Sequence, residues 1–340
     1  MPNRQRGALC LKEIPWGGGL SRVAMLLLVC ALVSSLAYAQ PAPKYPAKPV
    51  RMLGGAFGSP SDILARTLGP KLSELWGQPV VIENRTGAAG NLAAEAVARA
   101  DADGHTLLTV ATSFAVNATL YAHLRFDPRT DFLPVAMFGA TQNILVANPQ
   151  FAGRTVGELI ARAKSQPGKI DYASVGVGTS GHLTMELLKT MAGIDLAHVP
   201  YRSASQEITD LISGVVSLAM PTIPGVTGQI ETGKLRALAV SGSRRSANLP
   251  AVPTMAEAGV PGYEATTWYA LLAPAGVRSD IATRLNTEIG RILADPVVIE
   301  KLSKQGIEPM TMSPQQLAGY MTSEIDKWSA VVRAANIKVE

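Results

Sequence analysis

Glycine and hydroxyl residues gather in the stretch Gly176-Val-Gly-Thr-Ser-Gly181. The apolar run before it, residues 170–175, predicts a strand. Apolar side chains then recur at spacings of three and four from Leu183 to Met191, which predicts a helix. A glycine loop between a strand and a helix exposes backbone N–H groups at the positive end of the helix dipole, and such a point binds anions. The stretch therefore predicts an anion-binding loop.

Two enzyme motifs resemble this loop, and each differs from it in one feature. Gly176–Gly181 matches the dinucleotide-binding pattern G-x-G-x-x-G, but Asp195 stands before the next apolar run instead of at its carboxyl end, where the acid that binds the ribose belongs. The hydrolase pattern G-x-S-x-G needs one more residue than Gly178-Thr-Ser-Gly-His provides, which argues against Ser180 as a nucleophile. Neither motif supports an enzyme at this loop.

Further loops follow predicted strands in the first third of the chain. The first strand leads into Gly54–Ser59, the second into Gly87–Asn91, and the third into a loop over residues 112–117. Ligands of open α/β sheets bind at the carboxyl ends of the strands. We therefore expect these loops, with hydroxyls such as Ser59 and Ser113, to share one binding edge.

Helices are expected between these strands, which predicts βαβ units and a parallel sheet. One begins near Pro60 with Asp62 in its first turn, and Gly69-Pro70 inside it should kink or break it. A second runs from Leu92 to Ala100. The chain ends in further amphipathic helices, and no internal repeat is visible.

The histidines do not form a metal-binding motif. His105, His123, His182 and His198 include no pair at a spacing of two to four, so we expect no metal site. No carboxylate pair is spaced for acid–base catalysis, and we expect neither a catalytic residue nor a cofactor. His182 stands at a helix start beside the glycine loop, where either a ligand contact or a structural hydrogen bond fits.

The N-terminus resembles an export signal. Basic residues from Arg4 to Arg22 precede an apolar run, 23–36, that is too short to span a membrane. The run ends at Ala37-Tyr-Ala39, a small-x-small cleavage site, so residues 1–39 read as a signal peptide, cleaved after Ala39 on export to the periplasm. Val29 before Cys30 is not the small residue that a lipoprotein site needs.

Removal of this leader changes the charge balance. The whole chain has 31 basic and 26 acidic residues, a net charge of +5. The leader contains four basic residues and one acidic residue. Without it, 27 basic and 25 acidic residues remain, a net charge of +2. No nucleic-acid surface is expected from such a balance. Both cysteines also lie in the leader, so no disulfide is expected.

Ten motifs occur in the order found in Bug receptors, the TctC-like extracytoplasmic solute-binding receptors of the tripartite tricarboxylate transporter family, and the resemblance covers essentially the whole chain after the leader. They are Tyr45–Arg51, Gly77–Arg85, Gly87–Gly90, Asp103–Leu108, Asp131–Val135, Gly178–Leu183, His198–Arg202, Lys234–Val240, Leu249–Thr254 and Ala273–Gly276.

The resemblance implies an α/β fold of the two-domain periplasmic-binding-protein type (type II, Venus flytrap), with parallel-rich sheets and an interdomain cleft. One domain would comprise residues 44–140 plus 265–340, and the other residues 141–264. The chain would cross between them near Ala140 and Thr266.

The resemblance also implies a binding site that holds a carboxylate by backbone N–H groups, hydroxyls and water-mediated contacts. Two positions depart from the family pattern: Phe57-Gly-Ser59 stands where Pro-Gly-Gly is usual, and Ser203 where glycine is usual. The expected ligand-binding residues are Phe57, Gly58, Ser59, Asp62, Gly90, Asn91, Ser113, Gly178, Thr179, His182, Tyr201 and Arg202.

The implied function is capture of a small organic carboxylate by a monomeric periplasmic protein that delivers it to membrane transporter subunits. One alternative is a ligand-sensing receptor for a membrane signalling partner. Another is an exported dinucleotide-dependent enzyme, in which Glu83 would bind the ribose. Gly54–Gly58 lacks the G-x-G-x-x-G spacing that this enzyme needs.

Overall fold

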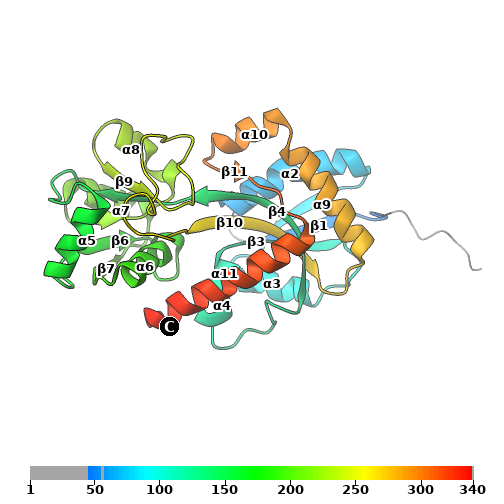
Figure 1. Ribbon diagram of the computed structural model, residues 1–340. Helices are drawn as coiled ribbons and strands as arrows, with labels where there is room; N and C mark the ends of the chain where they lie inside the picture. Colours follow the sequence, from blue (N-terminus) through cyan, green and yellow to red (C-terminus); the bar gives the residue numbers. More distant parts are fainter. Residues whose placement is uncertain (1–44, 55–56, 339–340) are drawn as a thin grey trace, which may run out of the picture. The chain divides into compact units, whose positions relative to one another are not determined.

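The computed structural model describes residues 45–54 and 57–338. The predicted signal peptide, its cleavage site after Ala39 and both cysteines lie outside these residues. Within them, the strands form a six-stranded and a five-stranded sheet (Figure 1). No helix in the described ranges is long and apolar enough to cross a membrane.

The first sheet has the order β11-β4-β10-β3-β1-β2. Strand β1 pairs in parallel with β2 and β3, whereas β10 runs antiparallel to β3 and β4, and β11 antiparallel to β4. Its strands are β1 (Val50–Gly54), β2 (Val80–Asn84), β3 (Thr106–Ala111), β4 (Phe132–Gln142), β10 (Thr266–Pro274) and β11 (Glu308–Pro309).

The second sheet has the order β7-β6-β8-β5-β9. Strand β6 pairs in parallel with β7 and β8, and β5 pairs antiparallel with β8 and β9. Its strands are β5 (Ile144–Ala147), β6 (Asp171–Ser174), β7 (Ala197–Pro200), β8 (Leu218–Ala219) and β9 (Arg236–Val240).

The α/β class is confirmed, but both sheets are mixed rather than parallel-rich. The reason lies in the path of the chain. Strand β4 is the last strand of the first sheet before the chain enters the second, and β10 is the first strand after it returns. An outgoing and a returning strand that lie side by side must run antiparallel, as β4 and β10 do.

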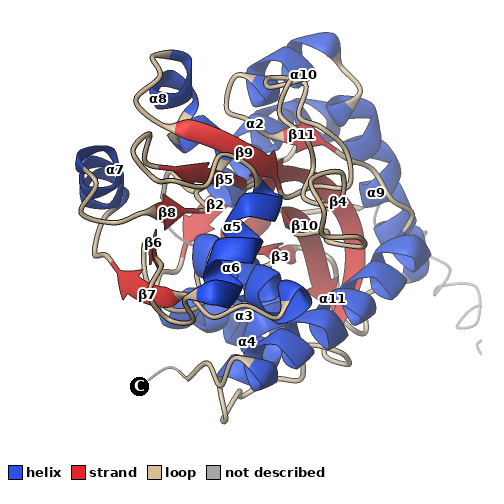
Figure 2. Ribbon diagram, turned by 60° about the vertical axis from the view of Figure 1, so that its left-hand side comes forward, coloured by secondary structure: helices blue, strands red, loops and turns tan. Residues whose placement is uncertain are grey.

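Helices cover both faces of the first sheet (Figure 2). Helices α2, α9 and α10 pack on one face, and α3, α4 and α11 on the other. On the second sheet, α5 and α6 cover one face and α7 the other. The helices have the following bounds: α2 Pro60–Trp76, α3 Asn91–Ala98, α4 Ser113–Leu120, α5 Val156–Ser165, α6 Ser180–Ala192, α7 Ala204–Ser213, α8 Thr227–Glu231, α9 Ser279–Leu293, α10 Pro296–Ser303 and α11 Pro314–Ala334. Short 3₁₀ turns lie at Ala88–Gly90 and Ile223–Gly225.

Two local predictions differ from the structure. Helix α2 runs through Pro70 without the break that was one of the two expected outcomes there, because its apolar face, Leu64, Leu68 and Leu72, is completely buried and holds the helix against the sheet. Residues 112–117 are not a loop: Ser113 begins α4, whose Phe114 and Val116 are buried. Burial of these side chains outweighs the weak helical pattern of the sequence.

The chain passes between the sheets at two places that are hydrogen-bonded to each other. Asn143 follows β4, and its backbone N–H donates to Oγ of Ser241, which follows β9, at 2.9 Å. The Ser241 hydroxyl donates in turn to the carbonyl of Ala265, just before β10. Thr267 Oγ1 also donates to Asn143 Oδ1 at 3.4 Å. The predicted division into two domains at these crossings stays a prediction.

Candidate ligand-binding site

A cavity of about 280 Å³ lies where strands β1, β2 and β3 reach their carboxyl ends. Apolar side chains of β3 and α4 form part of its wall, and small polar side chains and backbone form the rest. None of its lining residues carries a charged side chain. The lining residues are Ser59, Ser61, Thr86, Gly87, Ala89, Gly90, Asn91, Leu108, Thr109, Val110, Ala111, Ser113, Phe114 and Asn117.

The turn Gly87–Gly90 enters this cavity in an uncommon conformation. All four residues have positive φ, including Ala88 at 45° and Ala89 at 52°. Side chains other than glycine adopt such angles at a cost, and positions held in this way concentrate at functional sites. Something must therefore hold the turn in place.

Asn117 of α4 holds the turn. It is 2% exposed. Its Nδ2 donates to the carbonyl of Ala89 at 3.2 Å and to Oδ1 of Asn91 at 2.8 Å. The bond to Oδ1 fixes the orientation of the Asn91 side-chain amide. No described residue accepts a hydrogen bond from Asn91 Nδ2, so its two N–H bonds remain for a ligand.

Helices α3 and α4 both begin at the cavity, and neither N-terminus has a side-chain cap. The N-cap of α3 is Gly90, which has no side chain. The N-cap of α4 is Thr112. Its hydroxyl accepts from Trp268 N at 2.9 Å and donates to Thr266 O at 3.4 Å, so it is bound to the backbone of β10 and does not cap the helix. Side chains do cap α2, α5, α7, α10 and α11.

Unsatisfied N–H groups and helix dipoles make an uncapped N-terminus attractive to an anion. Two such termini meet at a cavity whose lining residues have no charged side chain. The arrangement can hold the negative end of a small molecule through backbone N–H groups and neutral side chains, without a cation.

A family model described as "Tripartite tricarboxylate transporter family receptor" matches residues 64–337. The chain belongs to this family. Protein BugT of Bordetella pertussis is 35% identical over 326 residues, which cover 94% of this chain and all of BugT. The family consists of periplasmic solute-binding receptors, which are not enzymes.

Solved structures of similar proteins agree with this assignment. Rpa4515 of R. palustris, solved with adipate, is 36% identical with a TM-score of 0.72, covering 86% of this chain and 99% of that one. MatC of Rhodopseudomonas palustris, solved with bound malate, is 30% identical with a TM-score of 0.69, covering 85% of this chain and 100% of that one.

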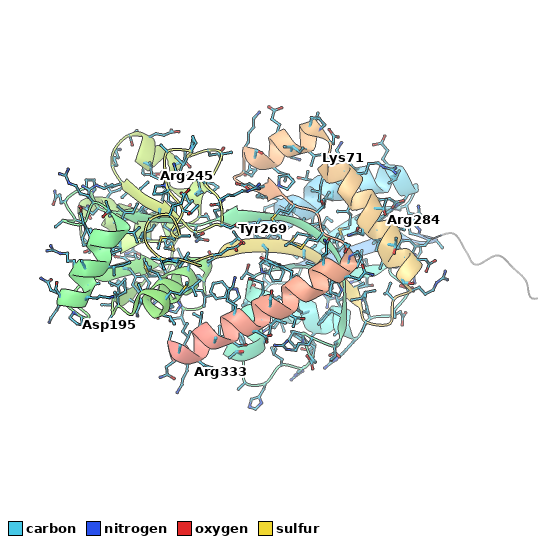
Figure 3. All side chains as sticks on the ribbon, viewed as in Figure 1. Lys71, Asp195, Arg245, Tyr269, Arg284 and Arg333 are labelled. Carbon is cyan, nitrogen blue, oxygen red and sulfur yellow. The ribbon has the colours of Figure 1, made fainter. Side chains whose placement is uncertain are left out.

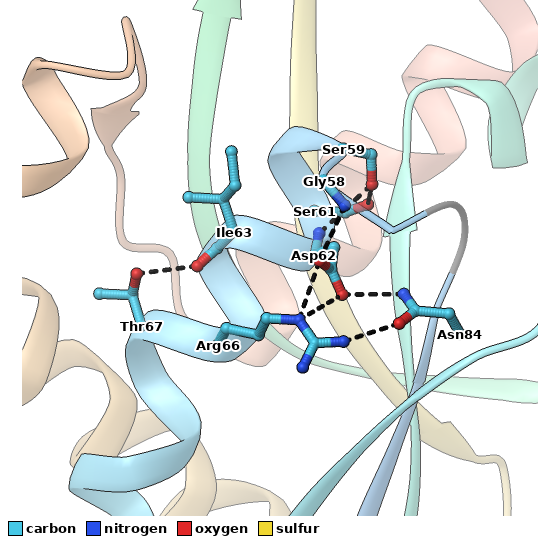
Figure 4. Close-up of polar contacts among 8 residues, drawn as sticks. All are labelled: Gly58, Ser59, Ser61, Asp62, Ile63, Arg66, Thr67 and Asn84. Carbon is cyan, nitrogen blue, oxygen red and sulfur yellow. Dashed lines mark hydrogen bonds and ion pairs between the residues drawn. The ribbon is translucent and has the colours of Figure 1, made fainter.

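In this receptor Asp62 holds Gly58, near the end of the first loop (Figure 4). The carboxylate of Asp62, 3% exposed, accepts hydrogen bonds from Gly58 N at 3.0 Å, Arg66 Nε at 2.9 Å and Asn84 Nδ2 at 2.8 Å. Burial opposes its charge, but these three donors outweigh burial and hold the pKa of Asp62 below its ordinary value. The geometry gives Asp62 a structural role in fixing the loop.

Phe57 and Gly58 lie outside the lining of the cavity. Phe57 is 77% exposed, and the Arg66 guanidinium lies 5.1 Å from the centroid of its ring. Ser59 lines the cavity, and its Oγ also accepts from Asp62 N at 3.4 Å as the cap of α2.

The glycine loop after β6 closes on itself. Thr179 Oγ1 donates to Gly176 O at 2.7 Å, and Gly178 N donates to His182 Nδ1 at 3.2 Å. Gly178 has a φ of +78°, and a Cβ atom placed on it would lie 3.0 Å from Cδ2 of Leu120, the last residue of α4. The loop therefore lies against the helix whose first turn lines the cavity.

Tyr201 and Arg202 follow β7 beside this loop. Tyr201 N donates to Ser174 O at 2.8 Å, and Asp210 of α7 is the acidic group that acts most strongly on its hydroxyl. Burial, with Asp210 next, raises the pKa of Tyr201 to about 12. Arg202 is exposed.

Four of the twelve predicted site residues line the cavity: Ser59, Gly90, Asn91 and Ser113. Of the glycine-loop residues, Gly178 lies beside Leu120 of α4, outside that lining. Sequence reasoning missed Thr86, Thr109 and Asn117. Asn117 stands four residues after Ser113, so reading residues 112–117 as a helix would have placed both on one face.

A second groove, of about 600 Å³, is formed by α2 and α9 and contains two cations, Lys71 and Arg291. Figure 3 labels Lys71 on α2. Lys71 Nζ is ion-paired with Asp295 at 2.9 Å. Glu74 and Glu288 also line the groove, so acidic groups outnumber cations. This balance disfavours an organic acid. No group of three or more His, Cys, Asp or Glu residues suited to a metal occurs in the described part of the chain.

Proposed function

We propose that this receptor captures a small organic carboxylate at the cavity between α3 and α4 and delivers it to the membrane subunits of a tripartite tricarboxylate-type transporter. The observation that carries the proposal is the pair of uncapped helix N-termini that meet at the strained turn Gly87–Gly90. Relatives solved with adipate and with malate, both organic acids, support the same ligand class.

The cavity selects its ligand by hydrogen bonds rather than by a cation. Asn91 Nδ2, the hydroxyls of Ser59 and Ser113, and N–H groups of the helix termini are the candidate donors. Each charge-assisted bond from such a group is worth roughly 1.5–3 kcal/mol. A volume of about 280 Å³ favours a small acid.

The glycine loop Gly176–Gly181 forms the opposite wall in this proposal. Its contact at Leu120 places it beside α4. We further propose that the two hydrogen-bonded crossings, at Asn143 and at Ser241–Ala265, act as the hinge when the receptor closes on its ligand. Export to the periplasm and release from the signal peptide after Ala39 belong to the same proposal.

A thermal-shift screen of mono- and dicarboxylates tests the ligand class. An acid at about 100 times its dissociation constant should stabilise the fold by roughly 2.7 kcal/mol. For a domain of about 200 residues that corresponds to several degrees of melting temperature, at about 2–4 °C per kcal/mol. Each acid is compared with its amide, which has the same shape without the charge. The proposal fails if no acid shifts the transition, or if the amides shift it equally.

A further inference from the structure

Two histidines that are far apart in the sequence lie ring to ring beneath the glycine loop. The ring centroids of His182, at the start of α6, and His198, on β7, are 4.3 Å apart. The His198 ring also stacks on Tyr172 of β6, with centroids 4.9 Å apart. His182 is 5% exposed and Tyr172 is fully buried. The three rings form a packed column at the carboxyl end of β6.

Both imidazoles reach the glycine loop. Nδ1 of His182 accepts from the backbone N–H of Gly178 at 3.2 Å. Nε2 of His198 lies 2.7 Å from Oγ of Ser174, and that Oγ is hydrogen-bonded to the N–H and the carbonyl of Gly176, at 3.2 and 3.1 Å. One histidine therefore holds the loop directly, and the other holds it through a serine.

The charged groups facing the rings are Glu186 and Lys189 of α6. Glu186 accepts from the Tyr172 hydroxyl at 2.6 Å and from Lys189 Nζ at 2.8 Å, so its charge is already compensated. Burial and, next, the neighbouring His198 lower the pKa of His182 to about 4, with Glu186 opposing them and Lys189 acting in the same direction as burial. Burial also lowers the pKa of His198. Both rings are neutral at neutral pH.

The hydrogen bond from Gly178 fixes the tautomer of His182. A nitrogen that accepts a hydrogen bond carries no proton, so the proton of the neutral ring is on Nε2. An imidazolium ring donates from both nitrogens and accepts at neither. Protonation of His182 would leave the N–H of Gly178 facing another donor.

We propose that His182 is a positioning residue for ligand binding: its neutral Nε2–H form holds Gly178 in the conformation that faces α4, and its protonation releases the loop. The inference deepens the proposed function, because it assigns the group that sets the second wall of the site. It does not require His182 to touch the ligand.

The direction of the pH effect follows from the pKa. The pKa of His182 falls from 6.5 in the unfolded chain to about 4 in the folded protein, so the unfolded chain binds the proton first. The contribution of His182 to stability is therefore complete above pH 6.5 and decreases as the pH falls toward 4. Its hydrogen bond to Gly178 should be lost only near the lower end of that range.

Amide hydrogen exchange at Gly178 in the ligand-free protein is the decisive measurement. His182→Phe keeps the stacked ring without an acceptor, and His182→Asn keeps an acceptor oxygen near the place of Nδ1. We expect exchange at Gly178 to accelerate about tenfold or more in His182→Phe, the effect of losing one typical hydrogen bond, and much less in His182→Asn. Equal exchange in both variants and the unmodified protein would overturn the proposal.

His105→Phe is the matched control. His105 also accepts a backbone N–H through one ring nitrogen, from Ala47 at 3.2 Å, but it lies just before β3 of the first sheet. This variant should leave exchange at Gly178 unchanged. Nitrogen NMR of His182 gives a second readout, and a proton found on Nδ1 at neutral pH would contradict the assigned tautomer.

Measuring adipate binding by the unmodified protein and by both His182 variants separates this proposal from the proposed ligand class. If adipate stabilises the unmodified protein, His182→Phe should weaken adipate binding more than His182→Asn does; equal binding by the two variants would overturn the positioning role. If no organic acid stabilises the unmodified protein, the proposed ligand class fails, while exchange at Gly178 still decides the role of His182.

Discussion

Ser113→Asp should leave the receptor at least as stable as before and abolish its binding of carboxylates. Ser113 is the first residue of α4, whose N-terminus has no side-chain cap. A carboxylate there interacts favourably with the helix dipole by about 0.3–1 kcal/mol. The same carboxylate occupies the place proposed for the ligand. Two like charges 4 Å apart repel by about 4 kcal/mol at an effective dielectric constant of 20, so affinity should fall at least about 100-fold.

Calorimetric titration of the best acid from the screen, together with urea unfolding, measures both quantities. Ser113→Asn is the control, because it has a similar shape and no charge, and its affinity should fall much less. If Ser113→Asp bound the acid as tightly as Ser113→Asn, the N-terminus of α4 would not be the anion site.

Gly178→Val should abolish the thermal shift produced by the acid. Gly178 has a φ of +78°, and its Cβ position lies 3.0 Å from Leu120. A branched side chain there adds atoms between the loop and Leu120, so the loop should move away from α4 and lose the close backbone approach that glycine permits. The variant also loses stability, because a β-branched residue is strained at positive φ.

Gly193→Val separates the two effects. Gly193 caps the other end of α6 with a φ of +60°, and no atom lies within 4 Å of its Cβ position. It carries a similar backbone strain without the contact to α4, so it should be destabilised and still respond to the acid. If Gly178→Val responded as Gly193→Val does, the glycine loop would not be part of the site.

The sequence predicted where the cavity lies because strand ends and glycines are local signals. Gly90, Asn91 and Ser113, which were expected to bind the ligand, line this cavity. Asn117 was missed because residues 112–117 carry little helical periodicity, and only their burial against the sheet makes them a helix. The carboxylate oxygens of Asp62 accept hydrogen bonds from Gly58, Arg66 and Asn84. These donors come from the first loop, helix α2 and strand β2, so the sequence alone could not reveal the structural role of Asp62.

The histidine pair illustrates a different limit. His182 and His198 are too far apart in sequence for any spacing rule to join them. Strand pairing brings them together: β6 and β7 align Tyr172 with His198, and α6 starts just beyond the end of β6. Of the two roles left open for His182, the structure supplies the structural hydrogen bond, to Gly178.

Mapping of backbone amide signals by NMR during titration with the best acid tests the central claim most directly. The largest changes should occur at Ala88 and Ala89 and at the first turns of α3 and α4, because these N–H groups are proposed to hold the carboxylate. A smaller change is expected at Gly178, whose N–H is bound to His182 but whose loop is proposed to form the opposite wall. Changes centred on the groove of Lys71 and Arg291, with the N-termini of α3 and α4 unaffected, would contradict it.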